Sequence, residues 1–240
     1  MKNILLTLSL LLVSFFAQCS VVIMGTRVIY PEGSRSINVN LSNGDSSPAL
    51  IQAWFDDGNV SKEPDVSKIP FIITPPVFRI APHTGQTMRI MYTGEPLPND
   101  KESLFWLNVM DIPAKPDMIS NTGHTSLNNY LQFAVRSRIK FFYRPSNLVI
   151  STNDAYQKVQ WNLSNGNKLT ASNPTPYYIT FNSVMYERDG KKYKTLDGGM
   201  IAPFSSEQFN LDNKVSAPGK VLWRVIDDNG GFQHGESLIQ

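Results

Sequence analysis

The residue types that most often carry catalysis are sparse in this sequence, and they are not spaced to work together. The three histidines, His83, His124 and His234, have no partner at a spacing typical of a metal site or a catalytic pair. The sequence has no nucleophile elbow, phosphate-binding glycine loop or zinc pattern, and its one cysteine, Cys19, lies near the N-terminus. A catalytic site must be argued from specific groups, so we predict a binding protein that is not an enzyme and needs no cofactor or metal.

Two acidic stretches, residues 56–59 (DDGN) and 227–231 (DDNGG), have the carboxylates that a calcium site would need. Neither has the ligand spacing of a known calcium loop. Asp, Asn and Gly are also the residues that tight turns require. We therefore predict that both stretches are turns.

Two lone cations interrupt otherwise apolar segments. Arg27 lies within residues 21–30, and Lys140 lies between Ile139 and Phe141. On pattern alone, the ordinary interpretation is a solvated side chain whose aliphatic part covers apolar surface on a half-exposed strand. The functional alternative is that the two cations converge from neighbouring strands to hold a carboxylate.

The elements that must position these cations are strands, because period-two alternation recurs along the chain and helical periodicity does not. Turn-forming pairs such as Asn43-Gly44, Asp189-Gly190 and Pro75-Pro76 separate the strands. Many short strands with frequent turns are typical of β-sandwiches. The alternating strands are centred on Ile37, Val39 and Leu41, on Val159, Trp161 and Leu163, and on Val221, Trp223 and Val225.

The chain length favours two sandwiches of ordinary size. The sequence Leu-Ser-Asn-Gly occurs at residues 41–44 and again at 163–166, each time closing an alternating strand early in its half of the chain. A proline that cannot continue a central strand, Pro145, marks the boundary. We predict an all-β protein with domains at residues 20–145 and 146–240.

Residues 1–19 are typical of a secretory signal peptide, because Lys2 is followed by an apolar run that ends at Ala17. A lipoprotein signal also ends at a cysteine, but Gln18 is large where that signal needs a small residue. No later stretch is apolar enough to span a bilayer, so we expect no stable membrane insertion. The 22 Lys and Arg residues nearly balance the 20 Asp and Glu residues, which gives no indication of a nucleic-acid partner.

The segment that stands out runs from Asn129 to Tyr143, about twice the usual strand length. Leu131, Phe133 and Val135 share one face, because side chains alternate along a strand. We predict one long strand over this segment, at the centre of the function.

Six segments closely resemble the signatures of the PapD-like periplasmic pilus chaperones, in the order that the family has them. Together they cover nearly all of the chain after the signal peptide. The segments are residues 25–31 (GTRVIYP), 73–80 (ITPPVFRI), 101–108 (KESLFWLN), 137–145 (SRIKFFYRP), 173–180 (NPTPYYIT) and 228–231 (DNGG).

The resemblance implies two immunoglobulin-like sandwiches set at an angle, with a cleft between them. It implies a periplasmic chaperone that completes an unfinished pilin subunit by adding a strand and delivers it to an outer-membrane usher; the family is itself an established example of strand addition. The implied roles are carboxylate anchoring for Arg27 and Lys140, groove filling for Leu131, Phe133 and Val135, and fixing of the interdomain angle for Glu102, Arg144 and Asp228.

Three further expectations follow from this interpretation. Lys140 and Leu131 would lie on opposite faces of an ideal strand, so we predict a bulge or strong twist between them. An exposed apolar edge also suggests transient self-capping, or a weak homodimer, when the protein is free. The alternatives from other classes are a secreted adhesin or carbohydrate-binding module, and a hydrolase whose acidic residues converge only in the fold.

Overall fold

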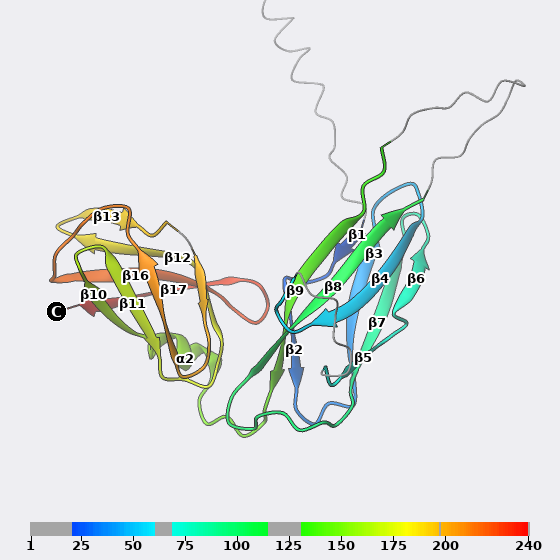
Figure 1. The fold of residues 1–240 in the computed structure, drawn as a ribbon, viewed down its shortest axis with the longest axis horizontal. Coiled ribbons are helices and arrows are strands. Elements are labelled where there is room, and N and C mark those ends of the chain that lie inside the picture. The colour runs from blue at the N-terminus through cyan, green and yellow to red at the C-terminus, as the bar shows by residue number, and fades with distance from the viewer. Residues whose placement is uncertain (1–20, 61–68, 115–130, 197, 240) are drawn as a thin grey trace, which may run out of the picture.

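The structure is a computed structural model that describes residues 21–60, 69–114, 131–196 and 198–239. The predicted signal peptide and Cys19 lie outside the described residues, as do Asn129 and Tyr130 at the start of the predicted long strand. Figure 1 shows two sandwiches whose long axes are set at a steep angle. The prediction of two immunoglobulin-like β-sandwich domains in tandem is therefore confirmed.

The first sandwich packs two sheets face to face. One sheet has the strand order β1-β3-β7-β5, and the other has the order β2-β9-β8-β4-β6. The bounds in the first sheet are β1 (Val21–Ile23), β3 (Ile37–Asn43), β7 (Gly85–Tyr92) and β5 (Phe71–Thr74). Those in the second are β2 (Arg27–Pro31), β9 (Val135–Arg144), β8 (Ser103–Pro113), β4 (Ala49–Asp56) and β6 (Val77–Ile80).

The alternation in the sequence predicts the buried face of these strands correctly. In β3, Val39 and Leu41 are buried while Asn38 and Asn40 are exposed. Aromatic rings fill the centre of the first core, where the Phe141 ring lies 4.7 Å from Phe71 and 4.8 Å from Phe55 between ring centroids.

The second sandwich has its own core, and this core is built in the same way. Val221, Trp223 and Val225 of β16 are buried, while the residues between them are only partly covered. Its sheets have the orders β10-β11-β15 and β13-β12-β16-β17, with β14 also paired to β12. The bounds are β10 (Gln160–Ser164), β11 (Lys168–Asn173), β12 (Ile179–Arg188), β13 (Lys191–Lys194), β14 (Gly199–Ile201), β15 (Ser205–Asn210), β16 (Gly219–Ile226) and β17 (Phe232–Ile239).

The repeated Leu-Ser-Asn-Gly sequence takes a different place in each sandwich. In the first domain it lies at the end of β3, which pairs with β1 and β7. In the second domain it forms the turn between β10 and β11. The predicted domain boundary at Pro145 stays a prediction.

One short helix, α2 (Thr152–Gln157), was not predicted. The side-chain oxygen of Ser151 accepts a hydrogen bond from the backbone N–H of Asp154 and caps the helix, and the helix buries two of its own residues, Ala155 and Tyr156. In the described part of the chain, no helix is long and apolar enough to cross a membrane.

Both acidic stretches form turns, as predicted. The side chain of Asp56 accepts a hydrogen bond from the backbone of Gly58 at 2.8 Å. Asp227 accepts backbone hydrogen bonds from Asn229 at 3.0 Å and from Gly231 at 2.9 Å in the β16–β17 hairpin. These are the local bonds for which Asp is selected in turns.

Candidate functional site

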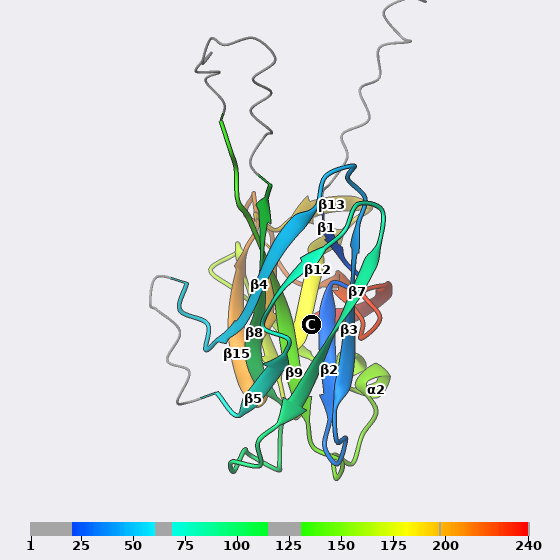
Figure 2. The same cartoon turned by 90° about the vertical axis from the view of Figure 1, so that its right-hand side faces the viewer.

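Parallel pairing of β2 with β9 places the two lone cations side by side. Arg27 lies directly opposite Lys140 in this register, and Figure 2 shows the two strands adjacent. The Arg27 guanidinium donates from Nη1 to the backbone oxygen of Ile226 at 2.8 Å, and Lys140 Nζ donates to Thr180 Oγ1 at 3.0 Å. Both side chains therefore point to the second domain, at the junction of the sandwiches.

This cation pair, Arg27 and Lys140, is partly buried, and the described residues place no acidic partner on either side chain. Burial, together with the charge of Arg27, lowers the pKa of Lys140 to about 8. Burial also lowers the pKa of Arg27, although nearby acidic residues of the second domain oppose this effect. Among the described residues neither cation forms an ion pair, and Arg27 Nε is buried without a hydrogen bond. The pair is therefore arranged to accept an anion.

The apolar segment of Leu131, Phe133 and Val135 is open to solvent. The three residues are 78%, 68% and 56% exposed, respectively. Such exposure of consecutive same-face apolar residues is unusual on a folded protein and is typical of a binding surface.

The prediction of one strand from residue 129 to 143 is wrong at its beginning, because β9 starts at Val135. The register with β8 pairs Asp111 with Val135, so Phe133 would lie opposite Pro113. Proline has no backbone N–H to donate, so the ladder ends there. Residues 131–134 form no strand, and Gln132 donates a side-chain hydrogen bond to the Pro113 carbonyl.

The outer edge of β9 is open next to the apolar segment. Strand β2 pairs only with Lys140–Arg144, whereas β8 pairs with β9 from Val135 to Tyr143 on the other side. The preceding strand, β1, pairs with β3 in the opposite sheet. Within the described ranges, no strand covers the outer edge of residues 135–139, so the backbone there can accept another strand.

The predicted bulge is absent from β9, where the register with β8 is continuous from Val135 to Tyr143. No bulge is needed, because the two uses of the strand lie on opposite faces. Ile139 and Phe141 face the first core, and Lys140 faces the second domain. The odd-numbered residues extend the core face outward to Val135, while the even-numbered residues carry the cations.

Comparison with known proteins gives the same family for both halves of the chain. Residues 20–149 match the pili and flagellar-assembly chaperone, PapD N-terminal domain, and residues 154–237 match the pili assembly chaperone PapD, C-terminal domain. The chain belongs to the PapD family of pilus-assembly chaperones.

Individual relatives agree with this assignment. The chaperone protein HifB of Haemophilus influenzae is 42% identical over 231 residues, which cover 95% of this chain and 92% of HifB. The crystal structure of the Pseudomonas aeruginosa CupB2 chaperone matches with a TM-score of 0.78 at 36% identity, covering 91% of this chain and 100% of CupB2. The SafB chaperone of Salmonella enterica, solved in complex with the SafA pilin, matches with a TM-score of 0.76 at 27% identity, covering 94% and 99%.

In this PapD-family chaperone, Glu102, Arg144 and Asp228 meet at the domain junction and form an interdomain trio. Arg144 Nε donates to Glu102 at 2.8 Å, and its two terminal nitrogens donate to the carboxylate of Asp228 at 2.6 and 2.8 Å. The second carboxylate oxygen of Glu102 accepts the backbone N–H of Tyr178 at 2.8 Å. The trio therefore bonds the first domain to the second at more than one point.

Burial and charge interactions shift the pKa values of Glu102 and Arg144 in the trio. Burial raises the pKa of Glu102, and the adjacent Arg144 opposes this shift. Burial would lower the pKa of Arg144, but its hydrogen bonds and charge interactions with Asp228 and Glu102 raise it instead. Arg144 consequently stays charged, which is what two carboxylates at one junction require.

Several residues at the junction were missed from the sequence. Thr180 and the Ile226 carbonyl accept hydrogen bonds from the cation pair. Thr180 ends the segment 173–180, which resembles a family signature, but the resemblance assigned it no role, and no pattern marks Ile226. Gly230 has a φ of +82°, and an added Cβ would lie 2.5 Å from Thr26 Oγ1, so this turn can approach β2 only with glycine. The Asn229-Gly230 turn signal indicated the glycine but not this approach.

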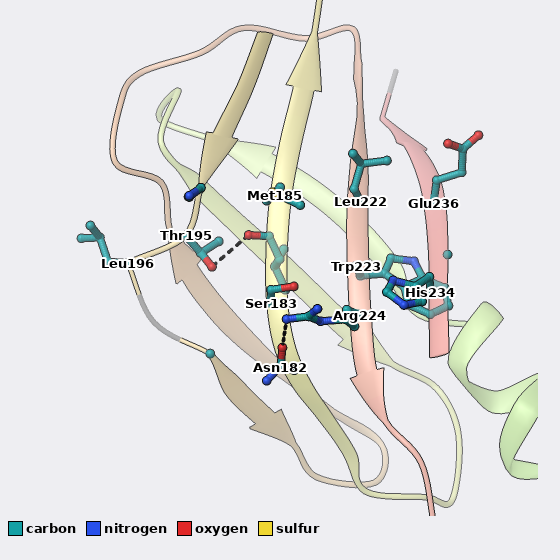
Figure 3. Close-up of a pocket in the computed structure, with 14 residues that line it drawn as sticks. Asn182, Ser183, Met185, Thr195, Leu196, Leu222, Trp223, Arg224, His234 and Glu236 are labelled. Atoms are coloured by element: carbon teal, nitrogen blue, oxygen red, sulfur yellow. Dashed lines mark hydrogen bonds between the residues drawn. The ribbon is translucent and has the colours of Figure 1, made fainter. Parts of the chain in front are cut away.

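A separate hollow of about 780 Å³ lies on the second domain (Figure 3). Its lining includes Met185, Leu222, His234 and Glu236, and none of the predicted site residues. Among the residues that the structure describes, no group of three or more His, Cys, Asp or Glu could hold a metal ion. This hollow has no convergent set of reactive groups that would indicate catalysis.

Replacing Arg144 with Ala should lower the free energy of unfolding by about 3–5 kcal/mol, because Glu102 would remain buried without its cation. The matched control is Lys192→Ala, which removes an exposed cation that pairs with Glu187 at 3.8 Å and should cost less than about 1 kcal/mol. Urea unfolding of both variants measures the difference. Equal losses would show that the interdomain trio adds no more stability than a surface ion pair.

Proposed function

We propose that this protein is a non-enzymatic periplasmic chaperone that stabilises pilus subunits by strand donation and delivers them to an outer-membrane usher. The observation that carries the proposal is the cation pair beside the open edge of β9 and the exposed apolar segment. The signal peptide predicted from the sequence supports the compartment. The complex of the related SafB chaperone with a pilin supports the class of partner.

The geometry favours a guest strand that runs parallel to β9. Such a strand would follow the line of β2 and end where β2 begins, opposite Lys140. In the parallel direction its C-terminal carboxylate would arrive at Arg27 and Lys140, whereas an antiparallel strand would bring a cationic N-terminus there. Two partly buried cations that have no acidic partner among the described residues favour the carboxylate.

The apolar segment would supply the hydrophobic part of the interaction. A subunit that lacks a strand exposes its core, and Leu131, Phe133 and Val135 are free to enter that gap. Each side chain contributes roughly 1.5–3 kcal/mol when it becomes fully buried. A one-residue slip would turn all three away from the gap, so a fixed carboxylate would also fix the register.

Removing either cation should prevent stable capture of a subunit. We expect Arg27→Ala or Lys140→Ala to lower recovery of a co-expressed fimbrial subunit about tenfold or more, because a charge-assisted hydrogen bond is lost. The control is Arg79→Ala, which removes an exposed cation at the far edge of the same sheet. Recovery from the periplasm by affinity purification gives the measurement, and unchanged recovery with both cation variants would refute anchoring.

Replacing Phe133 with Asn should weaken subunit binding about tenfold to a hundredfold. The thermal midpoint of the free protein should not change, because Phe133 is 68% exposed. Phe204→Asn, at an exposed site on the second domain, is the matched control.

The same Phe133→Asn variant tests self-capping. If a second copy covers the apolar segment, size measurement over a dilution series should show association of the parent protein that the variant loses. A parent protein that stays monomeric throughout would refute self-capping and leave subunit capture untouched. Unchanged subunit binding by Phe133→Asn would refute groove filling.

Anchoring should weaken as the pH rises above about 8. Lys140 binds a carboxylate only when it is protonated, and its pKa in the free protein is about 8. The affinity for a peptide with a free C-terminus should fall by up to about tenfold per pH unit above that value, since one proton is coupled to binding.

The control for this pH dependence is Lys140→Arg, which stays charged and should flatten the profile. Trp106, whose ring centre lies 5.8 Å from Lys140 Nζ, offers a fluorescence signal for the titration. A parent profile as flat as that of the variant would show that Lys140 does not hold the carboxylate.

A further inference from the structure

The outer face of the β9 sheet carries a set of arginine and tryptophan side chains that continues from the cation pair. Across the sheet, Arg27 lies opposite Lys140, Lys140 opposite Trp106, and Trp106 opposite Asp56. The next row pairs Arg138 with Asn108 and Asn108 with Trp54, and Arg136 follows on β9. Side chains of paired residues share a face, so these groups stand together on the side away from the first core.

Arg138 is held rigidly in this row. Its Nε donates to Asp56 Oδ2 at 2.9 Å and its Nη2 donates to Oδ1 of the same carboxylate, which gives a two-point contact. The guanidinium carbon lies 4.0 Å from the centre of the Trp106 ring, which places the cation against the ring face.

Arg136 is fixed in the same way one row further along. Its Nε donates to Asn108 Oδ1 at 2.8 Å, and its Nη2 lies 3.3 Å from Asp56. The guanidinium carbon lies 5.1 Å from the centre of the Trp54 ring. Asn108 also donates to Asp56 at 2.7 Å, so one amide and one carboxylate hold both arginines.

The charges in this cluster do not cancel. Burial would raise the pKa of Asp56, but hydrogen bonds from Arg138, Asn108 and the Gly58 backbone lower it to about 2, so Asp56 is charged at neutral pH. Among the described residues that contact one another here, two arginines against one aspartate leave an excess positive charge beside the cation pair. The side chain of Arg136 is 29% exposed and that of Arg138 is 19% exposed. In both residues, the guanidinium Nη1 has no hydrogen bond to another described residue.

We propose that Arg136, Arg138, Trp54 and Trp106, held by Asp56 and Asn108, form an arginine–tryptophan platform that selects acidic side chains near the C-terminus of the docked strand. The platform is continuous with the cation pair through Lys140 and Trp106, and its excess charge complements an acidic partner. This inference rests on the proposed strand donation, because the guest must lie along the open edge of β9.

The register of a parallel guest decides which side chains reach the platform. Residues in register with Arg136 and Arg138 would have their side chains on the platform face, as Arg27 does opposite Lys140. The residues between them would point to the opposite face, where Ile139 and Phe141 lie. Every second residue of the guest strand would therefore face the platform. Only at those positions would an acidic side chain be favoured.

Synthetic strand-forming peptides test this directly with the full-length mature protein. Two isomeric peptides carry a pair of Glu residues at alternate positions near the C-terminus, in opposite phases, and each is compared with its Lys counterpart. In one phase we expect Glu to bind about tenfold more tightly than Lys, and in the other phase we expect almost no preference. The preferred phase should lose its advantage at high salt.

Arg136→Gln should reduce the Glu preference to within about twofold while Asp56 keeps its contact with Arg138. Arg79→Gln removes the same charge from an exposed position at the far edge of the sheet and should leave the preference unchanged. Each peptide is also made as a C-terminal amide, which reports on the cation pair and not on the platform.

The outcomes separate the two proposals. A preference for Glu that persists in Arg136→Gln, or that is equal in both phases, overturns the platform while leaving strand donation intact. A lower thermal midpoint of Arg136→Gln with unchanged peptide selectivity gives the cluster a stabilising role only, and also overturns it. Equal binding of the acid and amide peptides refutes carboxylate anchoring alone. No binding of either peptide refutes strand docking, and the platform with it.

Discussion

The parallel pairing of β2 with the last part of β9 is the constraint on which the rest of this site depends. It places Arg27 opposite Lys140, and because β2 stops there, it leaves the earlier part of β9 with an open edge. In the proposed complex, the end of this one strand pairing would provide both the open edge for a guest backbone and the charged groups at which that backbone stops. Strand β1 does not cover this edge, because it pairs with β3 in the other sheet.

The second domain contributes the other half of the cation pair's environment. Ile226 and Thr180 each accept a hydrogen bond from one cation, and neither brings a negative charge. The cations are therefore oriented and partly desolvated but not neutralised, a state that costs stability unless an anion arrives. Arg144, four residues further along β9, is in the opposite situation, because it is paired with both Glu102 and Asp228.

Alternation in the sequence predicts the strands because each has one buried face, as in Val39 and Leu41 or in Val221 and Trp223. It cannot predict which strands are neighbours, so the meeting of Arg27 with Lys140 came from family resemblance and not from pattern. The start of β9 depends on Pro113 in its partner strand, and a pattern within β9 does not contain that information.

Two other features of the structure are also not visible in local sequence patterns. The six-residue helix α2 is too short for helical periodicity to be visible, and a single Ser151 cap defines it. Asp56 was assigned to a turn, and its bond to Gly58 is indeed there, but the same carboxylate also holds two arginines. Because the turn alone explains why an Asp is found at position 56, the sequence gives no reason to expect that the same side chain also binds Arg136 and Arg138.

The regular register of β9 changes how specificity in this site should be understood. With no bulge, the strand presents an apolar face that continues the first core and an opposite face that carries Arg136, Arg138 and Lys140. A guest strand that slipped by one residue would present its apolar side chains to the cations and its polar side chains to the core face, and both mismatches would be unfavourable. In the proposed complex, register would then be enforced by two faces and one terminus together, and a subunit would be recognised by its pattern of side chains without a deep binding pocket.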